Sequence, residues 1–77
     1  MSVREGVLNI LEETKPTKNL AEMNDIIDGG YIDSFELMLL ISALNEKFGI
    51  EIGIEDMVPD NFNSVDGIVK MVERLKS

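Results

Sequence analysis

Cysteine, histidine and tryptophan are absent from this chain of 77 residues. Without cysteine there is no disulfide framework, and without cysteine and histidine the usual zinc ligands are missing, so that only carboxylates and carbonyls remain as metal ligands. Histidine is also the commonest general base in enzymes. These absences weigh against a stand-alone enzyme, and we predict neither a catalytic residue nor a metal site.

Basic residues are scarce, because 7 lysines and arginines stand against 15 aspartates and glutamates, a net charge of −8. A strongly acidic surface opposes binding to nucleic acid and to anionic lipid, so the expected partners carry basic patches. The charge is also unevenly placed: residues 19–69 contain 11 acids and Lys47 as their single base. We therefore expect an acidic centre around any site in this part of the chain.

Long apolar runs are missing too. No segment is long enough to cross a bilayer, and the N-terminal residues lack the apolar core and cleavage site of a secretory signal. We expect a cytoplasmic monomer with no membrane insertion. The length suits one small domain, residues 1–77, near the size at which a single core becomes marginal.

Three segments carry apolar residues at helical spacing. The first helix is predicted over residues 3–13, before Pro16, and the second over residues 34–48, before Gly49. The third follows Asn63 or Ser64, either of which is a suitable cap. The apolar positions of the three helices are Val3, Val7, Ile10 and Leu11, then Leu37, Leu40, Ile41, Leu44 and Phe48, and last Val65, Ile68, Val69, Val72 and Leu75.

The segments between these helices are irregular. Residues 15–33 form a long connection whose apolar side chains should hold it against the helices, and residues 50–54 form an extended connector without a partner strand. One short helical turn is predicted over residues 55–58, ended by Pro59. The fold class is therefore all-α: a small antiparallel bundle of three main helices plus one short helix, with a long loop between the first two.

The most informative stretch is Gly29-Gly30-Tyr31-Ile32-Asp33-Ser34-Phe35-Glu36-Leu37, which delivers Ser34 to the start of a helix. Free N–H groups and the helix dipole at that end would stabilise a phosphate on the hydroxyl. Taken alone, Ser34 is better explained as an ordinary N-cap, which is the commonest use of serine before an apolar helix. Asp33 suits either turn formation or steering of a partner, and Glu36 suits the dipole whatever the function.

The Asp33-Ser34-Phe35 start of this helix, followed by its apolar stripe and Phe48-Gly49, resembles the acyl carrier and peptidyl carrier protein family. The resemblance extends over nearly the whole chain. It implies that Ser34 accepts covalent 4′-phosphopantetheine from coenzyme A, and that the thiol of this arm holds an acyl or aminoacyl group as a thioester. Ser34 would then be a substrate and not a catalytic nucleophile.

The resemblance also implies partners: a phosphopantetheinyl transferase, an acyl- or amino-acid-activating ligase, and a downstream acyltransferase or synthase. Carriers of fatty acid synthesis usually have an acidic residue where this chain has Leu39, and the segment after Phe48 looks longer than theirs. The longer segment is closer to that of D-alanine and other free-standing aminoacyl carriers, which serve cell-envelope or nonribosomal peptide chemistry. The two departures together favour loading with an amino acid or a specialised acyl group over fatty acid synthesis.

Three apolar residues, Phe35, Met38 and Leu39, fall beside or outside the core-facing stripe of their helix and are candidate partner contacts. They also leave a rival from another class open, a helical interaction module that is never modified. The acids Glu22, Asp25 and Asp28 lack the spacing of a calcium loop, so they are not predicted to bind metal.

Overall fold

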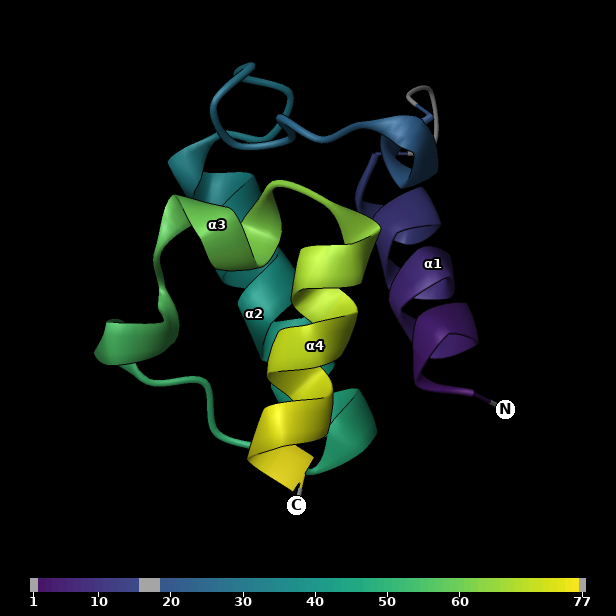
Figure 1. Cartoon of the computed structure of the whole chain (residues 1–77), viewed down its shortest axis with the longest axis vertical. Coiled ribbons are helices and arrows are strands. Elements are labelled where there is room, and N and C mark those ends of the chain that lie inside the picture. Colours follow the sequence, from purple (N-terminus) through teal and green to yellow (C-terminus); the bar gives the residue numbers. More distant parts are fainter. Residues whose placement is uncertain (1, 16–18, 77) are drawn as a thin grey trace.

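The computed structural model describes residues 2–15 and 19–76, and in them it contains helices and no strands. The helices, including two 3-10 turns, are α1 (Val3–Thr14), η1 (Leu20–Glu22), α2 (Ser34–Phe48), η2 (Ile54–Asp56), α3 (Pro59–Phe62) and α4 (Val65–Lys76). In Figure 1, α1 runs in the opposite direction to α2 and α4, and the connector with α3 returns the chain from the end of α2 to the start of α4. The predicted small helical bundle is confirmed.

The core is built from the helical stripes that the sequence predicts. Val7, Ile10 and Leu11 of α1 are buried against Leu40, Ile41 and Leu44 of α2, and α4 and Phe62 complete the core. Because apolar residues three or four positions apart share one face of a helix, each helix buries one stripe and leaves its polar residues in solvent. None of the helices in the described ranges is both long and apolar enough to span a membrane.

The long loop before α2 is fastened to the bundle as predicted, by apolar side chains, but also by a side-chain amide. Leu20, Ile26 and Ile32 are buried in the core. Asn63, at the end of α3, accepts hydrogen bonds on its Oδ1 from the backbone N–H groups of Ile27, at 2.9 Å, and Asp28, at 3.0 Å. The loop is thus held by side chains buried in the core and by hydrogen bonds from its backbone to Asn63. Residues 16–18 lie outside the described part of the loop.

One local prediction needs correction, and one alternative is decided. The sequence predicts a short helical turn over residues 55–58 that ends at Pro59, whereas the 3-10 turn covers Ile54–Asp56 and Pro59 begins α3. Proline suits the first position of a helix because its missing N–H would have no partner there. Of the two predicted caps of the last helix, Ser64 serves, since its Oγ accepts from the N–H of Gly67 at 3.0 Å, and Asn63 holds the loop instead.

Candidate functional site

The start of α2 is organised by Asp33 and not by Ser34. Asp33 is the N-cap, and its Oδ1 accepts a hydrogen bond from the N–H of Glu36 at 2.8 Å. Glu36 Oε1 accepts in return from the N–H of Asp33 at 3.1 Å, which completes a capping box. The explanation of Ser34 as an ordinary N-cap is therefore wrong, and the pattern of Asp33 followed three residues later by Glu36 was the signal in the sequence for this arrangement.

Ser34 is the first residue of α2 and is exposed. Among the described residues, no side-chain hydrogen bond uses its hydroxyl, which leaves the oxygen available for chemistry. The first N–H groups of a helix have no partner inside the helix. The capping box and the carbonyl of Asp33 satisfy those of Glu36 and Leu37, so the N–H groups of Ser34 and Phe35 remain for solvent or for an anion.

Lys15 also reaches the start of α2, which the distribution of charge along the sequence did not indicate. It is the C-cap of α1, and its Nζ donates to Glu36 Oε2 at 2.7 Å. This hydrogen bond is the largest cause that lowers the pKa of the Glu36 carboxyl below 4.5, and the bond from the N–H of Asp33 adds to it. The acidic centre therefore contains a base from the N-terminal side of the chain, 21 residues away.

An apolar surface follows the site along α2. Phe35, Met38 and Leu39 are 72%, 58% and 51% exposed, as expected from their positions outside the core-facing stripe. We call these three residues the α2 patch. Large apolar side chains that are this exposed contribute little to the core, so we expect them to contact other molecules.

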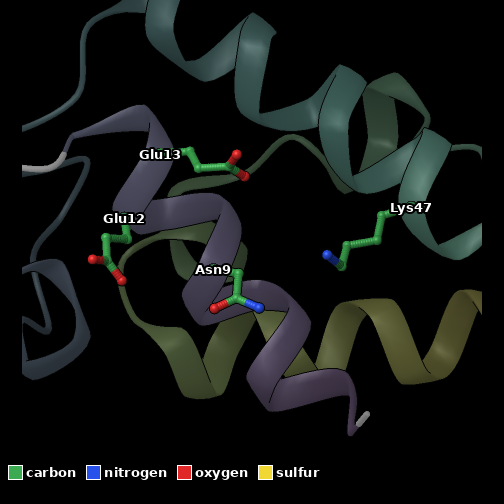
Figure 2. Close-up of a pocket in the computed structure, with 4 residues that line it drawn as sticks. All are labelled: Asn9, Glu12, Glu13 and Lys47. Atoms are coloured by element: carbon green, nitrogen blue, oxygen red, sulfur yellow. The ribbon is translucent and has the colours of Figure 1, made fainter.

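A second feature, an open depression between α1 and α2, lies apart from Ser34. Figure 2 shows Asn9, Glu12 and Glu13 on α1 and Lys47 on α2 around it. The residues around it are charged or polar, and none of them belongs to the start of α2.

The acids of the long loop do not converge on a common point. Glu22 accepts from the side-chain amide of Asn19 at 2.8 Å, and Asp28 accepts from that of Asn63 at 3.1 Å. Across the described ranges, no cluster of three or more acids is arranged to hold a metal ion. Glu22 and Asp28 each have a structural partner instead.

The profile of the phosphopantetheine attachment site family matches residues 5–72, which is 68 of the 77 residues. The match takes in the capping box, the whole of α2 and most of α4. The chain therefore belongs to the phosphopantetheine attachment site family, whose members are non-catalytic carriers with 4′-phosphopantetheine covalently attached to a serine.

Proposed function

We propose that Ser34 is the serine to which 4′-phosphopantetheine is attached. The observation that carries the proposal is the exposed, unused hydroxyl at the first position of α2, beside two N–H groups that have no partner inside the helix. A phosphate bound there gains from those donors and from the positive end of the helix dipole. The exposed position also suits a residue that another protein must reach.

The other serines within the matched residues fit the role less well. Ser64 Oγ already accepts from the N–H of Gly67, and Ser64 is half-buried. Ser42 is exposed, but it lies in the middle of α2, where backbone N–H groups are paired inside the helix. Neither offers a phosphate the free donors that Ser34 has.

The attachment reaction requires the chain to present Ser34 and a separate enzyme to activate it. Ser34 Oγ forms a bond to the phosphorus that carries the pantetheine arm of coenzyme A, and the phosphoanhydride bond breaks to release the adenosine bisphosphate portion. The hydroxyl proton must go to a base. Asp33 and Glu36 are already occupied in the capping box, so we assign the base to the transferase.

The function that follows is that of a thioester carrier. The pantetheine arm supplies the thiol that this cysteine-free chain lacks, and that thiol holds the acyl or aminoacyl group. The chain itself contributes the attachment point and surfaces for its partners: the transferase, an activating ligase and a downstream acyltransferase or synthase. Each complex should be transient, because the carrier must leave one enzyme to reach the next.

We further propose an aminoacyl group as the cargo, in preference to a fatty acyl group. The α2 patch supports this choice, because it presents Leu39 where carriers of fatty acid synthesis usually have an acidic residue. A partner that recognises this face would use an apolar surface as well as basic residues. Loading assays with a D-alanine-activating ligase, compared with a fatty-acyl-activating ligase, test the choice directly.

Intact mass spectrometry tests the attachment site. Wild type incubated with coenzyme A and a broad-specificity phosphopantetheinyl transferase should gain one phosphopantetheinyl group, Ser34→Ala should gain none, and Ser42→Ala should behave as wild type. Ser42 is a matched control because it is an exposed serine on the same helix. Modification of Ser34→Ala would refute the proposed site. No gain by wild type, while a control carrier is modified, would favour an unmodified interaction module.

A further inference from the structure

Lys15 joins the end of α1 to the start of α2. Its Nζ lies 2.7 Å from Glu36 Oε2, and the side chains of Lys15 and Glu36 are only 30% and 20% exposed. This partial burial distinguishes the pair from the one between Arg4 and Asp66, in which both side chains are more than half exposed. Partly buried pairs are screened less by salt than exposed ones.

Glu36 uses its two carboxylate oxygens for different purposes. Oε1 closes the capping box on the N–H of Asp33, and Oε2 receives the ammonium group of Lys15. The capping contact needs only an acceptor, so a glutamine would keep it. The contact with Lys15 instead depends on charge, and it can be removed without opening the first turn of α2.

Charge matters here because Asp33 and Glu36 stand on either side of Ser34 in the first turn. A phosphate carried by Ser34, and coenzyme A during its transfer, are negative, so both carboxylates repel them. Residues 19–69 supply only Lys47 as a base, at the far end of α2. At 1.5 Å per residue, Lys47 lies about 20 Å along the helix from Ser34, about two Debye lengths at 0.1 M salt.

We propose that Lys15 is a positioning residue for the modification of Ser34, which acts by pairing with Glu36 and so cancels the repulsion between that carboxylate and the phosphate transferred to Ser34. This inference depends on the proposed function. It adds the C-cap residue of α1 to the site, and it assigns the ion pair an effect on the reaction in addition to its effect on the fold.

The kinetics of modification by a phosphopantetheinyl transferase test the inference. Lys15→Met should lower kcat/KM by about two- to fivefold at low salt, the range expected for one charge near a helix end. Lys15→Arg should behave as wild type. Glu36→Gln should be modified at least as fast as wild type, and Lys15→Met combined with Glu36→Gln should recover the rate that Lys15→Met alone loses.

Lys47→Met is the matched control, because it removes the same charge from the chain but at the far end of α2. If Lys15→Met and Lys47→Met reduce kcat/KM equally, the effect belongs to net charge and the inference is wrong. If Glu36→Gln slows modification as much as Lys15→Met, the pair acts only as a structural link and the inference is also wrong. A ratio of wild-type to Lys15→Met kcat/KM that approaches one at about 1 M salt would support it, because salt then screens the repulsion that the lysine cancels in wild type.

A readout on the unmodified protein completes the test. An NMR titration should show a higher pKa for the Glu36 carboxyl in Lys15→Met than in wild type, with the amide signals of residues 33–36 still typical of a capped helix. An unchanged pKa would contradict the pairing itself. Failure of the inference remains distinct from failure of the proposed function, because in the first case wild type is still modified on Ser34 and in the second it is not.

Discussion

At the scale of single residues, the site is defined by a division of labour between Asp33 and Ser34. Asp33 caps α2, so Ser34 is released from the structural role that serine most often has before an apolar helix. The sequence showed both residues, but it left their roles open because either side chain is a good cap. The two roles are separated by the start of α2 at Ser34, where the sequence also predicts it, because this start makes Asp33 the N-cap.

This division predicts unequal effects on stability. Asp33→Ala should lower the free energy of unfolding by about 1 kcal/mol, because the N–H of Glu36 loses its acceptor. Ser34→Ala should change it by less than about 0.5 kcal/mol, because the hydroxyl makes no contact that the fold needs. Urea denaturation of the two variants measures both values, and a loss for Ser34→Ala as large as that for Asp33→Ala would contradict the assignment of the cap.

Glu36 predicts a dependence of stability on pH. Its pKa is held below 4.5 in the folded protein, mainly by the hydrogen bond from Lys15. As the pH falls through 4.5, the ordinary pKa of glutamate, the unfolded chain takes up the proton before the folded protein does. The free energy of unfolding therefore declines until the pH has passed the lower pKa of Glu36 in the folded protein. Above 4.5, the contribution of Glu36 is fully present.

Replacing Glu36 by glutamine removes this titration but keeps the capping contact. Denaturation of Glu36→Gln at a series of pH values should therefore show a shallower decline in stability below about pH 4.5 than wild type shows. Asp66, whose pKa is lowered chiefly by the hydrogen bond from Arg4, continues to titrate in both proteins and provides the internal reference. Identical slopes would mean that Glu36 is not stabilised by Lys15 in solution.

At the scale of elements, the apolar stripes predicted the three main helices, but no pattern in the sequence predicted the contacts of polar side chains. Helical spacing identifies a buried face because it depends on local geometry alone. The role of Asn63 depends on a loop 35 residues earlier in the chain, and no local pattern encodes that contact. The same reason explains why Lys15 was absent from the predicted site.

Asn63 should contribute more to the free energy of unfolding than its half-exposed position suggests. Asn63→Ala leaves the N–H groups of Ile27 and Asp28 without their acceptor, which we expect to cost about 1–3 kcal/mol in the free energy of unfolding. Asn24→Ala, an exposed asparagine in the same loop, should cost less than about 0.5 kcal/mol. Equal losses in urea denaturation would show that the loop is held by its apolar residues alone.

At the scale of the whole molecule, the net charge and the lack of histidine and cysteine limited the class of function, and the Asp33-Ser34-Phe35 motif then indicated the carrier family. The two absences weigh against a stand-alone enzyme and the charge indicates basic partners, and the chain belongs to a family of non-catalytic carriers. The fold then places the proposed attachment point at an exposed end of the bundle, with the α2 patch beside it. A carrier needs both features on an accessible face.

The charge of −8 predicts that association with a basic partner is steered electrostatically. The apparent kcat/KM for modification, with coenzyme A held saturating, should fall on the order of tenfold as ionic strength rises from about 0.1 to 1 M, while kcat changes less. Replacement of Glu51 and Glu55 by glutamine should weaken this dependence on salt. If kcat/KM of the charge-reduced variant falls with salt as much as that of wild type, the prediction is wrong. The dependence on salt would then come from the transferase and coenzyme A, not from the charge of the carrier.

The most direct test of the central claim is to locate the modification in the modified protein. Cleavage after glutamate separates the two exposed serines of α2, because residues 23–36 contain Ser34 and residues 37–46 contain Ser42. Mass spectrometry of this digest should find the phosphopantetheinyl group on the peptide of residues 23–36, with fragment ions that assign it to Ser34. Modification found on any other peptide, or none in a protein treated alongside a modified control carrier, would contradict the account.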